Sequence, residues 1–430
     1  MNTSATRSLS SSTFPRVVVT GIGLVTPFAT SREASWNAIR NGDRAVRWLN
    51  TDESPEPMPT NVRFAGAPHA KAQVSGHIKP LAFSNSEPVI HLANTAAQEA
   101  IVDSGLSNQA LSEIADRCGC VIGTSKVGLR GFASAFRSMN SAIDDRGMID
   151  LPWNQLGPDA AVRSVARTFD LRGPSLCPVA ACATGLVSLI RGADLIRSGE
   201  CDVVLAGSTD ASLVPIVLAS FQRLGVMARG FHDPTTACRP FAADRSGFVI
   251  GEGAAVFVLE QLESAQARGA SIYAEFMSGG MANDPSGITQ MEPDGASLAW
   301  LISDVLRRAD VAPHDIDYIN LHGTATRVND VAETQAVRTA FGAQADRVLC
   351  SSVKGAIGHL LGAAGSVETA ITLLALRDQI APPTVNLETA DPECDLDYVA
   401  KVARPARLRT VMKLSLGFGG HLAVGLFRSL

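Results

Sequence analysis

Residues 178–189 read PVAACATGLVSL: an apolar run typical of a strand ends at Cys182, small residues follow, and a helical pattern begins. Ala181, Ala183 and Gly185 let other backbone approach closely, which indicates a tight strand-to-helix turn. A thiol at a helix N-terminus lies near unpaired N–H groups, whose partial positive charge favours the thiolate. The stretch therefore predicts an α/β fold with a nucleophile at a turn, although a lone free cysteine is more often a buried structural thiol.

Short apolar runs alternate with helical patterns on both sides of this turn. In the first half, strands are expected at 16–20, 118–124 and 202–207, and helices at 31–41, 92–104 and 160–169. Unbroken apolar strands of this kind are typical of sheets covered on both faces. Gly21-Ile22-Gly23 lacks the third glycine of a phosphate loop, so we expect a plain tight turn that ends the first strand.

The same order of elements begins again near residue 270. Strands are expected at 271–277, 316–321 and 348–352, helices at 295–310, 333–341 and 365–377, and a last strand through Phe427. This repeat predicts two duplicated halves, 16–270 and 271–430, with the functional site where the halves meet. Residues 1–15 are rich in Ser and Thr, which predicts a disordered tail.

Composition excludes several classes of protein. The 430 residues are 18% charged with a formal net charge of -5, so no basic field indicates nucleic-acid binding. No apolar run approaches the roughly 20 residues that span a bilayer, and residues 1–15 lack the apolar core of a secretory signal, although an organelle-transit role stays open. The eight cysteines form no dense disulfide framework, and Cys118 and Cys120 are expected to be core side chains rather than metal ligands. We expect a soluble, cytoplasmic protein.

Two histidines of the second half lie where they can join Cys182. His322 follows a strand end in LHGTAT (321–326), and His359 precedes a helix in GHLLGAAG (358–365). In α/β sheets ligands bind beyond the carboxyl ends of strands, so the three side chains can share a crevice. A thiolate can take an acyl group from a thioester, and two imidazoles can stabilise the enolate of a second one. A cysteine hydrolase needs only one histidine, so the pair favours carbon–carbon bond formation.

With these motifs the chain resembles the elongating β-ketoacyl-[acyl carrier protein] synthases, type II condensing enzymes of the thiolase-like superfamily, over residues 16–427. The ordered motifs are LRGPS (171–175), the Cys182 turn, RPF (239–241), GFV and GEG (247–253), HGT and ND (322–330), Lys354 with GH (358–359), and GFGG (417–420). The resemblance implies a five-layer αβαβα fold of two duplicated halves and a homodimer. It also implies an acyl carrier protein as partner and no metal or other cofactor.

The resemblance implies a role for each matching residue. Cys182 would carry the acyl group, and its N–H with that of Phe418 would form the oxyanion hole. His322 and His359 would bind the malonyl carbonyl and assist decarboxylation. Phe418, on its glycine-rich loop, would act as a gate between the two half-reactions.

Four further residues complete the implied site. Lys354 would pair with Glu333, and Thr324 and Thr326 would bind the pantetheine arm. The implied reaction is a decarboxylative Claisen condensation of the acyl group with malonyl-[acyl carrier protein], in fatty acid or specialised lipid or polyketide synthesis.

Two departures from the family concern substrates. Lys126 stands in TSKVG (124–128), where the family has small and apolar residues at the acyl pocket. An ammonium there must be paired or point outward, so we predict that Lys126 shortens or redirects the pocket. The basic segment that docks the carrier is reduced to one lysine in 77–87, which leaves Arg223 and Arg229 as candidates for docking.

Two other departures surround the gate. Its loop reads LSLGFGGHL (414–422) in place of NSFGFGGTN, and the added His421 is expected to be a surface residue without a catalytic part. Ala242 and Ser246 replace two aspartates, and whether Asp244 compensates stays open.

Two other functions compete with an active condensing enzyme. A non-catalytic partner subunit, such as a chain-length factor, would lack the nucleophile, whereas Cys182 and both histidines are present. A degradative thiolase would use a second cysteine as base, and the final loop offers none. The departures favour a specialised pathway over housekeeping elongation.

Overall fold

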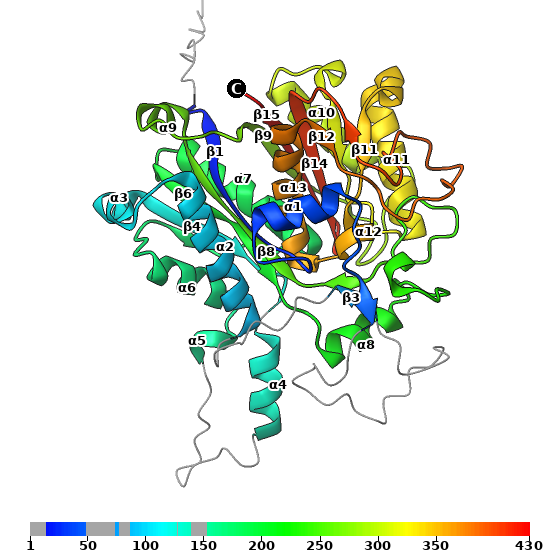
Figure 1. Ribbon diagram of the computed structural model, residues 1–430, viewed down its shortest axis with the longest axis horizontal. Helices are drawn as coiled ribbons and strands as arrows, with labels where there is room; N and C mark the ends of the chain where they lie inside the picture. Colours follow the sequence, from blue (N-terminus) through cyan, green and yellow to red (C-terminus); the bar gives the residue numbers. More distant parts are fainter. Residues whose placement is uncertain (1–13, 49–73, 77–86, 127, 139–152) are drawn as a thin grey trace, which may run out of the picture.

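The computed structural model describes residues 14–48, 74–76, 87–126, 128–138 and 153–430 (Figure 1). The expected tail up to residue 13 and the docking segment at 77–86 lie outside these residues. Ten strands form the main sheet: β1 (Val17–Val25), β4 (Cys118–Gly123), β5 (Ser175–Leu176), β6 (Val203–Asp210), β8 (Gly253–Gln261), β9 (Ala274–Asn283), β10 (Tyr318–Asn320), β11 (Leu349–Ser351), β14 (Thr410–Gly417) and β15 (His421–Arg428).

Helices and two small sheets surround these strands. The helices are α1 (Arg32–Arg40), α2 (Pro88–Ser104), α3 (Asn108–Glu113), α4 (Leu129–Ser138), α5 (Trp153–Leu156), α6 (Ala160–Thr168), α7 (Thr184–Arg197), α8 (Pro215–Arg223), α9 (Leu262–Ala267), α10 (Ala296–Arg308), α11 (Arg327–Phe341), α12 (Lys354–Ile357) and α13 (Ala364–Asp378). The small sheets are β2 (Arg47–Trp48) with β3 (Val74–Gly76) and β7 (Ile250–Gly251), and β12 (Ile380–Ala381) with β13 (Arg404–Pro405).

The strand order repeats between the two halves of the main sheet. Outward from its centre, the first half runs β1-β8-β6-β4-β5 and the second runs β9-β15-β14-β10-β11. In both halves this is the order first, fifth, fourth, second, third along the chain. The halves join where β1 pairs antiparallel with β9, at Val17 opposite Phe276. The two halves of the sheet therefore share the same strand topology.

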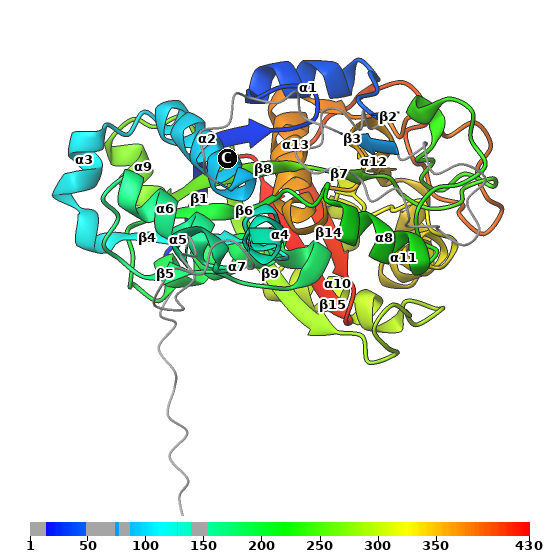
Figure 2. The same ribbon diagram turned by 90° about the horizontal axis from the view of Figure 1, so that it is seen from below.

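Helices and strands stack in five layers (Figures 1 and 2). Helices α2 and α6 cover the outer face of the first half, and α10, with α11 packed beside it, covers the outer face of the second. Between them lie α7 and α13, which contact each other and strands of both halves. The arrangement confirms the five-layer αβαβα fold of two duplicated halves.

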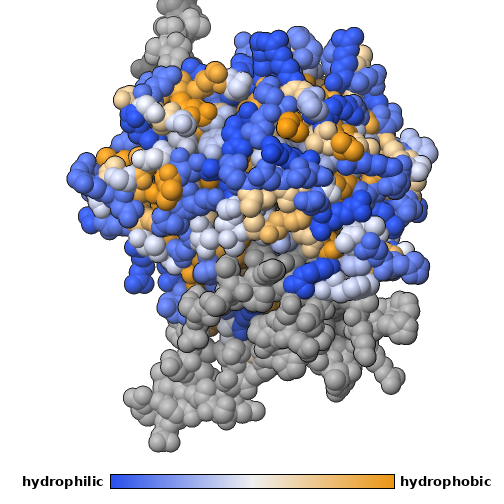
Figure 3. Space-filling view, in the orientation of Figure 1, coloured by the Kyte–Doolittle hydropathy of each residue, from blue (hydrophilic) through white to orange (hydrophobic). Residues whose placement is uncertain are grey.

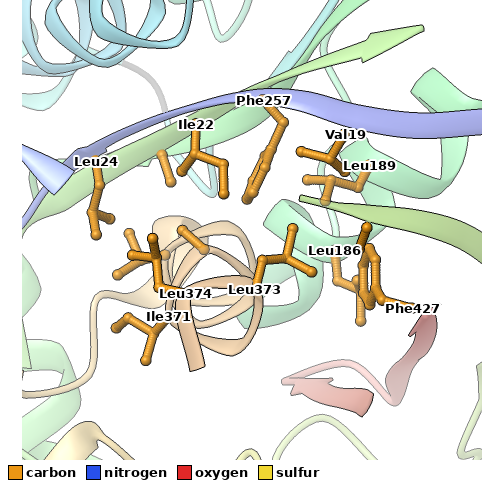
Figure 4. Packing of buried hydrophobic residues seen from close by; sticks show 14 of the residues in the cluster. Val19, Ile22, Leu24, Leu186, Leu189, Phe257, Ile371, Leu373, Leu374 and Phe427 are labelled. Atoms are coloured by element: carbon orange, nitrogen blue, oxygen red, sulfur yellow. The ribbon is translucent and has the colours of Figure 1, made fainter. Parts of the chain in front are cut away.

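The central layer forms the largest apolar core. Residues 364–376 of α13 are all buried, so this helix is covered on every side, as expected for a helix between two sheets. Figure 4 shows its Leu373 facing Leu186 of α7, while Leu374 lies toward Leu24 of β1. On the face seen in Figure 3, the described surface is mostly hydrophilic with scattered hydrophobic residues. None of the helices described is both long and apolar enough to cross a bilayer.

The expected turn at Gly21-Ile22-Gly23 is wrong, because β1 continues through it to Val25. A β-carbon on Gly21 would lie 2.9 Å from the β-carbon of Ser104, and one on Gly23 would lie 2.8 Å from the backbone nitrogen of Ala100. The glycines therefore let α2 pack directly on the strand. Strand β8, which lies between β1 and β6, was not predicted at all.

Candidate active site

A tight turn into a helix forms at Cys182 as predicted, but the apolar run before it is not a strand: residues 177–180 are irregular, and β5 ends at Leu176. Ala181 has φ +46°, a left-handed value that is unfavourable for a residue with a side chain. Thr184 holds this conformation: its hydroxyl accepts the Ala180 N–H at 2.9 Å and donates to the Ala181 carbonyl at 2.7 Å. Residues 181–183 make one short turn before α7 begins. Cys182 is 7% exposed, at the N-terminal end of a central helix.

The second half contains the same turn without a nucleophile. Leu361 has φ +48°, residues 361–363 form a short turn, and α13 follows directly. The two helix starts touch: a β-carbon on Gly365 would lie 2.6 Å from the backbone nitrogen of Leu186, and one on Gly185 would lie 2.9 Å from the Gly365 carbonyl carbon. This close contact explains both glycines and fixes the start of α7 relative to the second half.

His322 and His359 come together as expected. His322 follows β10 and His359 follows α12, and their ring centroids are 5.2 Å apart at an interplanar angle of 82°. Phe248 packs edge-on against His359 at 5.0 Å. Both imidazoles line one cavity of about 520 Å³ together with Cys182. The structure thus brings the three predicted side chains to a single site.

Thr324, Thr326 and Phe418 line the same cavity. The Phe418 ring stacks on Phe221 with centroids 6.2 Å apart. Behind it, the Gly419 N–H donates to the Ile288 carbonyl at 2.7 Å. In this structure the loop predicted to act as a gate therefore lies against neighbouring residues, with the Phe418 ring at the cavity.

The expected pairing of Lys354 with Glu333 is wrong. Lys354 forms its ion pair with Glu368 of α13, and it donates to the His322 carbonyl at 2.5 Å. Glu333, on α11, instead accepts the N–H groups of His322 at 2.5 Å and Gly323 at 2.8 Å. The reason is that the Glu333 carboxylate is used by these two N–H groups, whereas Glu368 lies beside the Lys354 ammonium. Glu333 holds the N–H side of the His322 peptide and Lys354 holds its carbonyl.

The surroundings keep both histidines neutral. Burial lowers the pKa of His322 and of His359 well below the usual value, and the charge of Lys354 lowers both further. The Lys354 ammonium, which can only donate, lies 3.4 Å from Nδ1 of His322. This contact makes Nδ1 the acceptor and leaves the ring proton on Nε2. His322 can therefore donate a hydrogen bond while uncharged.

The expected preference for a thiolate at Cys182 does not hold in this state. Burial raises the pKa of the Cys182 thiol to about 11, and the charges of Lys126 and Lys354 oppose this only in part. The cysteine is therefore a protonated thiol near neutral pH, and its proton must leave when it attacks.

Two buried charges of the site were missed by the sequence reasoning. Glu368 is 2% exposed and lies between two ammonium groups, those of Lys354 and Lys413. The distance from Lys413 Nζ to Glu368 Oε2 is 2.7 Å. A charged residue inside an otherwise apolar buried helix or strand is the signal that would have found both.

Lys126 is paired, as an ammonium in this position must be. Its Nζ donates to the Ser125 hydroxyl at 2.7 Å and lies 3.6 Å from the buried carboxylate of Asp210. It also lies 6.0 Å from the centre of the Phe221 ring, which stacks on Phe418, the predicted gate residue. Lys126 does not line the cavity that holds Cys182, so its effect on an acyl pocket stays a prediction.

Asp244 does not supply a negative charge to the buried Arg245. Asp244 forms an ion pair with Arg239 at 3.1 Å and is largely exposed. The buried guanidinium of Arg245 pairs instead with Asp391 at 2.6 Å and with Asp330 at 3.4 Å. Asp391, from a distant loop, therefore supplies a negative charge in this region.

The remaining predicted residues lie at the surface or at its edge. Arg223 and Arg229 are exposed, and Arg229 lines the cavity mouth together with Arg327, which was not predicted. His421 is partly buried at the start of β15 and does not line the cavity. Within the described part of the chain, no group of three or more His, Cys, Asp or Glu side chains is arranged to hold a metal ion.

Comparisons with known proteins show the family to which the chain belongs. Residues 15–265 match the family model for the beta-ketoacyl synthase N-terminal domain, and residues 273–388 match that for the C-terminal domain. The chain is 37% identical over 410 residues to the tetracenomycin polyketide synthase ketoacyl synthase alpha subunit of Streptomyces glaucescens, covering 94% of this chain and 95% of that one. It is also 37% identical over 410 residues to 3-oxoacyl-[acyl-carrier-protein] synthase 2 of Rhizobium meliloti, covering 94% and 96%.

A solved structure extends the likeness to three dimensions. It is a type II polyketide synthase acyl-carrier protein in complex with its ketosynthase bound to the hexaketide, with 30% identity and a TM-score of 0.83. The match covers 97% of this chain and all of the other. The matching family models, the similar full-length relatives and the shared fold lead to one conclusion. The chain belongs to the beta-ketoacyl synthase family.

Proposed function

We propose that the chain catalyses the decarboxylative condensation of an acyl group on Cys182 with malonyl-[acyl carrier protein]. The observation that carries the proposal is the meeting of Cys182, His322 and His359 in one cavity. A thiol beside two neutral imidazoles supplies a nucleophile for one thioester and hydrogen-bond donors for another. Membership of the family and its 3-oxoacyl synthase relatives support the same reaction.

In the first half-reaction the Cys182 sulfur attacks the carbonyl carbon of the acyl thioester. The thiol proton leaves, the carrier's sulfur departs as a thiol, and the acyl group stays on Cys182. We propose that the N–H groups of Cys182 and Phe418 bind the oxyanion. A β-carbon on Gly417, the residue before Phe418, would lie 3.1 Å from the Cys182 nitrogen, so the two loops are close enough to share this task.

In the second half-reaction malonyl-[acyl carrier protein] enters the vacated cavity. His322 and His359 donate to the thioester oxygen, so that cleavage of the carboxylate bond releases carbon dioxide and leaves the electron pair as an enolate. The enolate carbon attacks the acyl carbonyl, and the Cys182 sulfur leaves with the pair from the broken thioester. Neutral imidazoles suit this step because they donate without drawing the malonyl carboxylate into an ion pair.

We propose an acyl carrier protein as the partner that delivers both substrates. A ketosynthase of the same fold has been solved with its acyl-carrier protein. Arg229 and Arg327 at the cavity mouth, with exposed Arg223, would attract an acidic carrier, and Thr324 and Thr326 would bind the pantetheine arm inside. The Thr324 and Thr326 hydroxyls already bond each other at 2.8 Å, so they form one polar spot on the wall.

We also propose a homodimer joined at the edge of the main sheet. Strand β5 ends the sheet, and its described residues have no further strand beside them. Both of its residues are exposed, with Leu176 38% exposed, and Val179, which follows the strand, is 58% exposed. An unpaired edge with apolar neighbours favours pairing with a second copy. Light scattering coupled to size-exclusion chromatography tests this, and a monomer at micromolar concentration would contradict it.

We also propose two halves divided near residue 270, a cytoplasmic location, a role for Lys126 in acyl selection, and a specialised pathway. The division into halves at residue 270 is supported by the repeated strand order. A cytoplasmic location is supported by eight free cysteines, which suit a reducing compartment. The position of Lys126 beside Phe221 and Asp210 supports a role in acyl selection, and the departures from the family favour a specialised pathway.

A direct experiment separates this enzyme from a non-catalytic partner subunit. Wild-type protein and Cys182→Ala are incubated with an acyl-[acyl carrier protein], and the tryptic peptides are analysed by mass spectrometry. We expect an acyl adduct on Cys182 and a β-ketoacyl product after addition of malonyl-[acyl carrier protein]. A wild-type protein that takes up no acyl group from a panel of primers would support the non-catalytic alternative.

A further inference from the structure

A buried lysine lies beneath the two histidines and has no part in the reaction as described so far. Lys413 is in the middle of β14, where it is opposite Asn320 of β10 and Gly425 of β15. Its side chain is fully buried. A buried ammonium is costly unless every proton finds a partner, so its contacts show what holds it there.

Lys413 Nζ contacts three oxygens. It is 2.7 Å from Glu368 Oε2, 3.1 Å from the Leu321 carbonyl and 3.4 Å from the Asn320 carbonyl. These carbonyls lie at the end of β10, immediately before His322. Lys413 therefore reaches the strand end from which His322 projects.

Lys354 makes the matching set of contacts one residue further along. It pairs with the other oxygen of Glu368 and donates to the carbonyl of His322 itself. Glu368 thus bridges two ammonium groups from two different elements. Together the two lysines hold consecutive carbonyls, those of Leu321 and His322.

We propose that Lys413 is a positioning residue for decarboxylation, which acts through Glu368 and the Leu321 carbonyl to hold His322 and keep both imidazoles uncharged. The inference rests on the proposed function, because it concerns the step in which the histidines bind the malonyl carbonyl. Lys413 does not line the cavity that holds Cys182 and the two histidines.

The charges around Lys413 set the direction of its effect. Glu368 of α13 faces it directly, with Lys354 of α12 and Glu333 of α11 nearby. Burial and Lys354 lower the pKa of Lys413 to about 8, while Glu368 opposes the change, so the side chain is charged near neutral pH. Its charge lowers the pKa of His322 and that of His359. Removing it must therefore make each imidazole easier to protonate.

The test is the pH profile of carbon dioxide release from malonyl-[acyl carrier protein]. Lys413→Met removes the charge at similar length, and Lys413→Gln removes it while keeping a donor for the Leu321 carbonyl. Lys413→Arg keeps the charge, and Lys401→Met removes an exposed lysine paired with Glu388 as a control for total charge. Acyl transfer to Cys182 is measured in parallel by mass spectrometry.

We expect the acidic limb of the Lys413→Met and Lys413→Gln profiles to move up by about one pH unit, since one nearby charge typically shifts a pKa by that amount. On that limb the rate falls by about tenfold per unit. Acyl transfer to Cys182 should change much less, and Lys413→Arg and Lys401→Met should keep the wild-type limb.

Two results would overturn the inference. One is a neutral variant that folds and keeps the wild-type acidic limb. The other is an equal loss of acyl transfer and carbon dioxide release at every pH, which is the result of general damage to the fold. If the wild-type protein releases no carbon dioxide at all, this result contradicts the proposed function, and the inference, which rests on that function, is contradicted as well. The pair of neutral variants guards against one of them failing to fold.

Discussion

The close contact between α7 and α13 can be tested by adding a single methyl group. Gly185 lies in the first turn of α7, three residues after Cys182. In Gly185→Ala the new β-carbon would be 2.6 Å from the Ser208 hydroxyl oxygen and 2.9 Å from the Gly365 carbonyl carbon. Non-bonded carbon atoms rest at about 3.5 Å or more, so the two helices must separate by more than half an ångström.

Two effects of opposite sign decide the size of the change. Alanine is the better helix former, which stabilises α7 by about 1 kcal/mol. Overpacking against rigid backbone costs about 3 kcal/mol, because neither helix can move without disturbing the buried core between the sheets. We therefore expect a net loss of about 2 kcal/mol, or roughly 2 °C in the melting temperature of a chain of 430 residues.

The assay combines thermal unfolding with the rate of condensation. A displaced α7 moves Cys182 away from His322 and His359, so the rate should fall about tenfold or more in protein that is still folded. Gly199→Ala is the control: a β-carbon there meets no atom within 4 Å, and its φ of +77° costs only about 1 kcal/mol of backbone strain. A Gly185→Ala protein as stable and as active as wild type would refute the reasoning.

Three other predictions concern the cavity and its mouth. Because the pKa of the Cys182 thiol is raised to about 11, its alkylation by iodoacetamide should accelerate about tenfold per pH unit from pH 7 to about pH 10. Peptide mass spectrometry measures the rate at Cys182, and a rate that stops rising near pH 8 would contradict the raised pKa. Arg229→Glu should raise KM for acyl-[acyl carrier protein] about fivefold with little change in kcat, and the difference should shrink in high salt; an equal effect at all salt concentrations would argue against electrostatic docking. Lys126→Ile should raise kcat/KM for a long saturated primer relative to a short one by about tenfold; unchanged selectivity would remove Lys126 from the acyl pocket.

The main site residues were predictable because local sequence features mark them. Cys182 follows an apolar run and precedes small residues, and His322 lies between a strand pattern and a glycine. Such features indicate where a chain turns, and in α/β folds the turns beyond the ends of the strands form the ligand-binding sites. The alternation of strands and helices, and its restart near residue 270, likewise predicted the layered and duplicated fold.

The electrostatic support of the histidines was not predictable in the same way. Glu333 and Glu368 are both buried, and spacing along the chain does not tell which of them reaches Lys354. The answer depends on how α11 and α13 pack, which is a property of the tertiary structure. The prediction of a turn at Gly21-Ile22-Gly23 was wrong for the same reason, since these glycines let α2 pack closely on β1.

The central claim is that the nucleophile and the histidine pair divide the two half-reactions between them. The most direct measurement follows the acyl adduct on Cys182 and carbon dioxide release from malonyl-[acyl carrier protein] in wild type, His322→Ala and His359→Ala. The account predicts that both histidine variants still form the adduct while their carbon dioxide release falls by about a hundredfold or more. Adduct formation lost together with decarboxylation, or decarboxylation that persists without either imidazole, would contradict it.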